Sequence, residues 1–203
     1  MGLRETKMER TRQLIADKAF ELFTAQGFAT TTMEQIAAAA EVGPRTLYRY
    51  YATKESLLLT FVEQKLDAAL DVLRAQPEDV PLPEALYKLV DYVLRTVAES
   101  GDRIIAVYEL AWRTPSARAQ LSDKTSHWRR ELATEISRRM GGRSAELAAA
   151  LASANTMTVI EVSIHNWVSS GGRANMRRLT HRALDLLREG AVPVPTPRAR
   201  SAT

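Results

Sequence analysis

Apolar side chains recur every three or four residues along most of the 203-residue chain, a spacing that places them on one face of an α-helix. No stretch shows the sustained alternation of apolar and polar residues that is typical of a half-buried strand. The pattern therefore predicts an all-α fold. About nine helices are expected, over residues 10–26, 33–40, 44–50, 53–75, 83–100, 102–113, 116–140, 144–169 and 174–189.

Turn-forming residues divide the chain into four parts. Residues 1–9 are expected to form a flexible arm, followed by a compact unit of short helices over 10–55. The long helix from Thr53 leads into a second, helical domain over 56–190, and this helix is the natural mechanical link between the two. The last stretch, AVPVPTPRARSAT, is rich in proline and poor in core residues, so 191–203 is predicted to be a disordered tail.

The short helices of the first unit carry clear start signals. Thr32 is a good N-cap, and Gln35 three residues later completes a capping box. Gly43 can cap the next helix, where Pro44 suits the first helical position because its missing N–H would be unpaired there. Thr53 caps the helix that follows. Two short helices joined by a tight turn form a helix-turn-helix, which predicts a DNA-binding domain.

The segments TTMEQIAAAAEV, TLYRYY and TKESLL appear in the order found in one regulator family. They resemble the DNA-binding domain of TetR-type transcriptional regulators, and the detailed resemblance covers about residues 10–60. One departure is Tyr51, where the family often has Phe; a tyrosine can fill that core position if its hydroxyl reaches a partner. The resemblance implies a helical ligand-binding and dimerisation domain after the DNA-binding domain.

The N-terminal end of the second short helix should enter the major groove of double-stranded DNA. Pro44, Arg45 and Thr46 lie there. Arg45 can form a bidentate pair with guanine, and the alternatives are a phosphate contact or a solvated side chain. Thr46 suits a phosphate or a thymine methyl group, and Thr32 suits a phosphate because backbone N–H groups at its helix start point outward.

The family resemblance implies further contacts with the sugar-phosphate backbone. By this resemblance Tyr48, Tyr50 and Lys54 should bind it, and a lysine at a helix N-terminus is suited to phosphate. Arg49 lies further round the helix and is a candidate for a phosphate contact only. Leu47 is expected in the core.

The helix over residues 147–168, LAAALASANTMTVIEVSIHNWV, is apolar around most of its circumference, which favours burial on more than one side. The family resemblance implies that the last two long helices join two subunits into a homodimer. A symmetric dimer also fits a palindromic operator, because each copy reads one half-site. The alternative is a helix central to its own domain.

The middle helices are expected to enclose a small, largely apolar effector. Aromatic residues and methionine with a few polar groups make such pockets, although any helical core contains the same residue types. Glu161 and His165 are spaced to hold a metal in principle, but no third ligand accompanies them, so a polar pair is the simpler interpretation. The candidate lining residues are Tyr92, Tyr108, Trp112, His127, Trp128, Met157, Glu161, His165 and Trp167.

Composition limits the kind of protein. With 45% apolar residues the chain can bury a sizeable core, and without cysteine it can form neither a disulfide framework nor a thiolate metal site. No apolar run approaches the roughly 18 residues that span a bilayer. The charged start MGLRETKMERTR lacks the apolar segment of a secretory signal. A cytoplasmic protein with no membrane contact is therefore expected.

Two other functional classes compete with the regulator. An enzyme is disfavoured because the sequence has no G-x-S-x-G, H-E-x-x-H or Gly-rich phosphate-binding motif, and neither a cofactor nor a bound metal is expected. A ligand-independent activator or nucleoid-associated protein stays open as an alternative. The net charge of +4 suits any polyanionic partner, and within residues 1–55 the two signs of charge nearly balance. The position of each cation therefore matters more than the total.

Overall fold

The computed structural model describes residues 3–142 and 145–195, and within these ranges the chain forms nine helices and no strand. This confirms the predicted all-α fold. In chain order the helices are α1 (Leu3–Gln26), α2 (Met33–Ala39), α3 (Pro44–Tyr50), α4 (Lys54–Arg74), α5 (Leu82–Glu99), α6 (Gly101–Arg113), α7 (Pro115–Met140), α8 (Ala145–Ser169) and α9 (Met176–Arg188).

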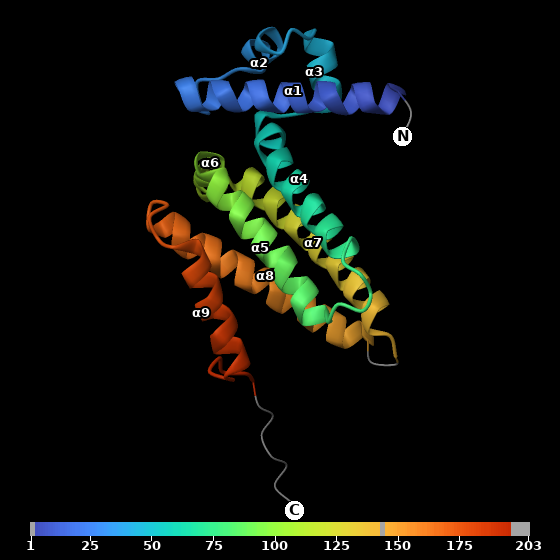
Figure 1. Ribbon diagram of the computed structural model, residues 1–203. Coiled ribbons are helices and arrows are strands. Elements are labelled where there is room, and N and C mark those ends of the chain that lie inside the picture. Colours follow the sequence, from blue (N-terminus) through green and yellow to red (C-terminus); the bar gives the residue numbers. More distant parts are fainter. Residues whose placement is uncertain (1–2, 143–144, 196–203) are drawn as a thin grey trace, which may run out of the picture.

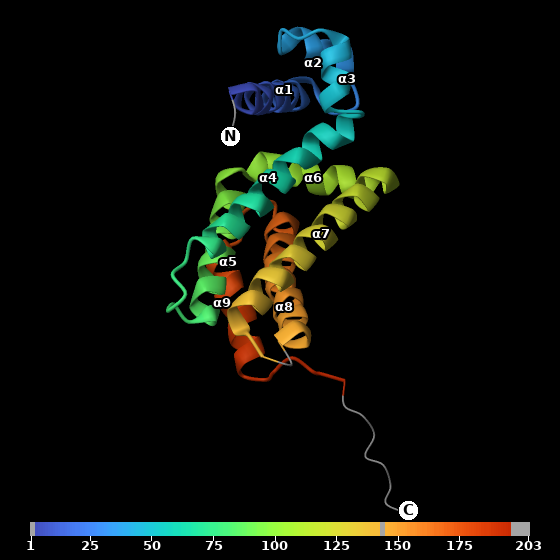
Figure 2. The same ribbon diagram turned by 90° about the vertical axis from the view of Figure 1, so that its right-hand side faces the viewer.

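The helices form two units that follow each other along the molecule. Helices α1, α2 and α3 form a unit at one end, and α4 leads from this unit into a bundle that also contains α5, α7, α8 and α9 (Figures 1 and 2). Helix α1 lies across the start of α4, while α2 and α3 lie on the side of α1 that faces away from the bundle (Figure 1). This arrangement leaves the outer side of α3 open for a large partner.

The N-terminal segment differs from its prediction. Residues 3–9 belong to α1 and do not form a separate arm. The segment LRETKMER consists mostly of strong helix formers and contains neither glycine nor proline, so nothing in it stops the helix from extending backward. Residues 1–2 lie outside the described part of the chain. At the other end, 191–195 continue beyond α9 without helix, and the rest of the predicted tail is outside the described residues.

Two hydrophobic cores hold the molecule together. The first joins α1, α2 and α3 to the start of α4 around fully buried side chains such as Ile15, Ile36 and Leu47. The second lies in the bundle, around side chains such as Leu89 and Leu132. Helix α6 contributes to both cores, so it lies at the boundary between the two domains.

Two side chains of α7 donate hydrogen bonds to backbone carbonyls of α4 and of the residues just after it. The indole N–H of Trp128, a side chain only 2% exposed, donates to the Leu66 carbonyl at 2.6 Å. The guanidinium of Arg139 donates to the Leu73 and Gln76 carbonyls at 2.9 and 2.5 Å. These carbonyls lie at the C-terminal end of α4, where the helix leaves acceptors unpaired, so Arg139 caps that end.

Helix α8 is long and apolar enough to span a bilayer by length and composition alone. Within the molecule, side chains such as Ala149 and Ile160 are buried against neighbouring helices. A central helix of a bundle has the same composition as a spanning one because both lose contact with water.

Candidate DNA-binding interface and effector site

The capping residues of α2 do what the sequence predicts. The Thr32 hydroxyl accepts from the Gln35 backbone N–H at 3.2 Å, and the Gln35 side chain accepts from the Thr32 N–H at 2.9 Å. The turn into α3 holds one surprise: the left-handed backbone belongs to Glu41, at φ 53°, while Gly43 is extended at φ −67°. A glycine at position 41 would take this conformation at lower cost.

Helix α3 divides its residues between core and surface. Leu47 is fully buried, whereas Arg45 and Arg49 on the same helix are exposed and Tyr48 is 49% exposed. Pro44 and Thr32 are also exposed, and Thr46 and Tyr50 are half-buried. All eight predicted DNA-contacting residues therefore keep accessible surface, although Tyr50 also packs against the core.

Lys54 is the exception among the predicted contacts. Its ammonium donates to the carbonyls of Phe28, Ala29 and Thr31 at 2.9, 3.3 and 2.7 Å, and it lies 4.8 Å from the centre of the Phe28 ring. An ammonium has three hydrogens, and these carbonyls use all of them. The expected phosphate contact does not fit this geometry. Lys54 instead ties the start of α4 to the loop between α1 and α2.

Tyr51 occupies the core position expected for it. The ring is 1% exposed, and its hydroxyl donates to the Arg12 carbonyl in α1 at 3.1 Å. Burial raises the pKa of Tyr51, so the hydroxyl stays protonated and remains a donor. This tyrosine does more than a phenylalanine could, because it connects the end of α3 to α1 by a hydrogen bond.

A hollow of about 240 Å³ lies between α1 and α3. Its lining combines Thr46 and Arg49 of α3 with Lys7 and Thr11 of α1. Two cations and the Thr46 hydroxyl around one hollow are suited to a phosphate, while the Thr11 hydroxyl already donates to the Lys7 carbonyl at 2.9 Å. Sequence reasoning missed Lys7 because it began the first helix at residue 10; helix propensity over residues 3–9 is the signal that finds it. Thr11 lay inside the predicted helix, and no signal in the sequence marks it as a lining residue.

The predicted effector-lining residues do not come together. Three of them are buried in the bundle core: Trp128, Met157 and Trp167. Because the Trp128 N–H is already bound to Leu66, it is not free for a ligand. Tyr92 and Tyr108 are half-buried at the edge of this core, and burial together with Glu161 raises the pKa of Tyr108 to about 12.

The other predicted lining residues face solvent. Trp112 is 83% exposed, which corrects its expected place in an enclosed pocket. His127 pairs with Glu131 at 3.3 Å on the surface of α7. Glu161 and His165 are exposed to solvent on α8. Among the described residues, no group of three or more potential ligands could hold a metal ion.

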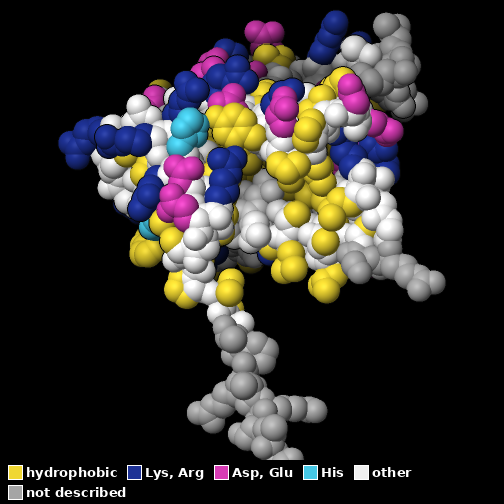
Figure 3. All heavy atoms as spheres, turned by 60° about the horizontal axis from the view of Figure 1, so that its bottom comes forward, with side chains coloured by type: hydrophobic (Ala, Val, Ile, Leu, Met, Phe, Trp, Pro, Cys, Tyr) yellow, Lys and Arg dark blue, Asp and Glu magenta, His cyan; other side chains and the backbone are white. Residues whose placement is uncertain are grey.

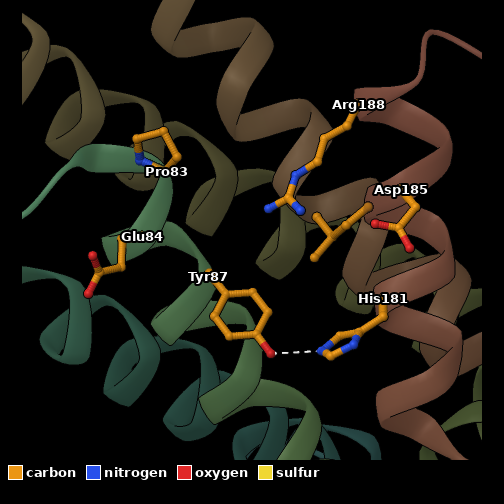
Figure 4. A pocket seen from close by; sticks show the side chains of 7 residues that line it. Pro83, Glu84, Tyr87, His181, Asp185 and Arg188 are labelled. Atoms are coloured by element: carbon orange, nitrogen blue, oxygen red, sulfur yellow. Dashed lines mark hydrogen bonds between the residues drawn. The ribbon is translucent and has the colours of Figure 1, made fainter.

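A larger hollow lies elsewhere, between α5 and α9. It has a volume of about 440 Å³, within the usual range for small-molecule sites. Figure 4 shows Tyr87 of α5 and His181 of α9 meeting across it, with the hydroxyl 2.9 Å from the imidazole Nε2, and Arg188 reaching in from α9. The remaining lining residues are Pro83, Glu84, Leu184 and Asp185.

An apolar stripe on the outer side of α8 is left uncovered. Leu147, Leu151 and Val162 are 70%, 59% and 47% exposed. Leu151 lies about one turn after Leu147 and Val162 about three turns after Leu151 along the same side, with Thr158 between. Figure 3 shows that hydrophobic side chains gather over one part of the lower end of the molecule, beside a part rich in charged groups. Large apolar stripes of this kind mark interaction surfaces.

Both parts of the chain match known families. Residues 15–60 match the model for bacterial regulatory proteins of the tetR family, and residues 80–192 match the model for the MftR C-terminal domain. The chain belongs to the TetR family of bacterial regulatory proteins. It is thus a helix-turn-helix transcriptional regulator by family, as the resemblance in its sequence indicates.

Individual relatives agree with this assignment. The HTH-type transcriptional regulator TcmR of Streptomyces glaucescens is 36% identical over 146 residues, which are 69% of this chain and 65% of that protein. This chain therefore spans a little under two thirds of that relative's length. The similar proteins are regulators and point to no enzyme family.

Solved TetR-family structures share the fold. Thermus thermophilus FadR, a repressor in complex with lauroyl-CoA, has a TM-score of 0.63 at 24% identity, over 94% of this chain and 100% of that one. Bacillus subtilis FadR in complex with stearoyl-CoA has a TM-score of 0.61 at 18% identity, over 88% of this chain and 98% of that one. At these identities the likeness shows the architecture alone.

Proposed function

We propose that this TetR-family protein is a homodimeric repressor that binds a palindromic operator and is released by a small effector. The observation that carries the proposal is the division of α3: Leu47 is fully buried and fixes the helix, while Arg45 and its neighbours on the outer side are accessible. A rigid helix with an exposed, partly cationic N-terminal end suits the major groove.

The proposed contacts fall into two kinds. Arg45 reads a base edge, with guanine as its natural partner, and Pro44 and Thr46 lie beside it at the groove. Thr32, Tyr48, Arg49 and Tyr50 bind the sugar-phosphate backbone and fix the register of the helix. We add Lys7, which lines the same hollow as Arg49, and we remove Lys54, whose hydrogens are already used.

The uncovered stripe on α8 supports a dimer through α8 and α9. Leu147, Leu151 and Val162 would be covered by the same surface of a second copy, as a two-fold axis requires. Two recognition helices related by that axis would bind half-sites about one turn of DNA apart. Such a regulator works in the cytoplasm, where the operator is.

We propose a small, largely apolar effector bound within the α5–α9 bundle. The predicted aromatic residues around Tyr92 and Tyr108 are candidates together with the hollow between α5 and α9. The two FadR complexes support effector binding in this architecture, without naming the effector of this chain. Release follows if the effector binds the DNA-incompetent state more tightly than the DNA-bound state.

The test is selection of bound duplexes from a random DNA pool, with the wild type and with Arg45→Ala. Arg130→Ala, which removes an exposed arginine from α7, is the matched control. The expected result is a palindrome whose preference relaxes at one position per half-site in Arg45→Ala only, with a loss of about 1–3 kcal/mol there. Binding without a consensus that depends only on salt would contradict sequence-specific repression.

A further inference from the structure

The DNA-binding unit is attached to the bundle at two places. One is α4, which runs continuously from the first core into the second. The other is α6 with the start of α7: Ile104 of α6 belongs to the bundle core, while Val107 and Leu110 of α6 and Ala117 of α7 belong to the core of the DNA-binding unit. A single continuous helix would leave the unit free to rock about the start of α4, and a second attachment restricts that motion.

The polar part of the second attachment is a contact between Arg103 of α6 and Asp17 of α1. Both terminal nitrogens of the guanidinium lie 3.2 Å from the same carboxylate oxygen of Asp17. The guanidinium also lies 4.3 Å from the centre of the Phe20 ring and 5.3 Å from that of Phe61. The Arg103 side chain is 26% exposed, so water screens the contact only in part.

This contact belongs to a chain of hydrogen bonds across three helices. The Gln13 amide in α1 donates to the same Asp17 oxygen at 3.1 Å, and the Gln64 amide in α4 donates to Gln13 at 2.8 Å. The space enclosed by these side chains measures only about 10 Å³. Helices α4, α1 and α6 are therefore fixed against one another, with little room for rearrangement that keeps all contacts.

The start of α6 is in turn set by α8. A Cβ atom on Gly101 would lie 3.0 Å from the Trp167 ring, so the glycine lets this ring of α8 approach the start of α6 closely. Arg103 follows two residues later. A displacement of α8 in the bundle would move the start of α6, and Arg103 with it.

We infer that Arg103 is a positioning residue for DNA binding: through Asp17 it holds α1, and with it α3, at the angle that the operator requires. The inference rests on the proposed function but goes beyond it, because it assigns the polar part of the second attachment to a single ion pair. Arg103 touches no DNA in this role. Its effect on affinity arises only through the orientation of the DNA-binding unit.

The first test is a double-mutant cycle on operator affinity with Asp17→Ala, Arg103→Met and the pair together. Methionine keeps the aliphatic bulk over the phenylalanine rings and removes the charge. Each single change is expected to weaken operator binding about fivefold, the equivalent of about 1 kcal/mol at the upper end for partly exposed ion pairs. The double variant should be no weaker than either single one, because the same contact is lost in all three.

The sign of the Asp17→Ala effect separates positioning from simple electrostatics. Removing an acidic residue near DNA strengthens binding if only charge matters, whereas loss of positioning weakens it. Glu21→Ala is the matched control, since Glu21 lies on the same helix and pairs only with Lys18 on α1 among the described residues. Additive effects in the cycle, or tighter binding by Asp17→Ala as for Glu21→Ala, would overturn the inference. If wild type and Glu21→Ala both lack a specific site, the proposed function fails.

A second measurement needs no DNA. The chain has no cysteine, so Ala38→Cys on α2 and Arg130→Cys on α7 give one pair of spin-label sites, both exposed. Labelled protein is diluted into unlabelled protein so that one chain is measured at a time. Arg103→Met should change the mean of the distribution of distances between the labels and should also broaden the distribution. An unaltered distribution would show that α4 alone sets the orientation and would refute the role of Arg103.

Discussion

In the DNA-binding unit, α2 and α4 begin with reciprocal capping boxes at Thr32 and Thr53, whereas no side-chain cap hydrogen bond begins α5, α6 or α7 in the bundle. Capping follows neither the domain nor the helix length strictly, because α3 has no side-chain cap and Asn175 caps α9 in the bundle. Helices α2 and α3 have seven residues each, too few to be stable on their own, while α7 has 26 residues and a long face to bury.

The polar ties also differ in what they join. In the DNA-binding unit, Lys54 binds carbonyls of the loop between α1 and α2, and Tyr51 adds a hydrogen bond to α1 from within the core. In the bundle, Trp128 and Arg139 add hydrogen bonds to helices that already share a large core. The comparison teaches that the small unit depends on local polar contacts, and that these contacts leave its outer side free for DNA.

The bundle should be most sensitive to loss of buried bulk. Trp128→Ala removes an indole that is 2% exposed and leaves the Leu66 carbonyl without its donor, so a loss of about 3–5 kcal/mol in the free energy of unfolding is expected. Urea unfolding followed by circular dichroism measures it. Trp112→Ala is the control at 83% exposure and should stay within about 0.5 kcal/mol of wild type. Equal losses for both would show that the bundle does not depend on its core in this way.

The sequence predicts the fold well because its signals are local. Start and stop residues such as Thr32, Thr53 and Gly141 lie where helices begin or end. These signals do not locate the start of α1, because no capping residue marks it and only helix propensity favours a helix over residues 3–9. Helix boundaries without a cap need tertiary structure to settle them.

The site is predictable in one domain and much less in the other. In α3, periodicity separates the buried Leu47 from the exposed Arg45. Periodicity does not reveal that Lys54 meets carbonyls some 25 residues earlier in the chain, since that contact depends on the loop's path. In the bundle, aromatic residues such as Trp112 and Trp128 look alike in sequence, and only packing decides which is exposed.

Lys54→Met tests whether the DNA-binding unit depends on polar ties. Loss of three hydrogen bonds from a charged group should lower the free energy of unfolding by about 2–3 kcal/mol. If Lys54 is structural, operator binding weakens but its dependence on salt keeps the same slope, because no phosphate contact is lost. Arg49→Ala is the opposite case: stability is retained, and the salt slope falls by about one. A reduced slope for Lys54→Met would restore the phosphate role.

Thr53→Ala measures the local caps directly. The Thr53 hydroxyl accepts from the Ser56 N–H at 3.2 Å, and its removal is expected to cost about 1 kcal/mol. Ser100→Ala is matched to it in the bundle, where Ser100 precedes α6 without a side-chain cap, and should cost nearly nothing. Chemical denaturation of both variants gives the two values. A larger loss for Ser100→Ala would reverse the contrast between the two domains.

Asp67 offers the smallest effect and a test of the bundle's surface charges. Burial, followed by the nearby carboxylates of Glu63, Glu131 and Asp71, raises the pKa of Asp67 above its ordinary value of 3.8. Its charged form is therefore unfavourable in the folded protein, and the wild type regains stability as pH falls through the raised pKa. Asp67→Asn mimics the protonated form, so the variant should be about 0.2–0.5 kcal/mol more stable at neutral pH, with the gain vanishing below the ordinary pKa.

Glu135→Gln should change the stability of the same bundle in the opposite direction. Hydrogen bonding to Arg138 is the main cause that lowers the pKa of Glu135, so its carboxylate stabilises the fold at neutral pH and that stability is lost as pH falls through the lowered pKa. Unfolding midpoints across pH 3–7 should therefore rise above wild type for Asp67→Asn and fall below it for Glu135→Gln, most clearly at the neutral end. If both variants moved in the same direction, charge pairing would not govern this surface, and the bundle's stability would rest on its apolar core alone.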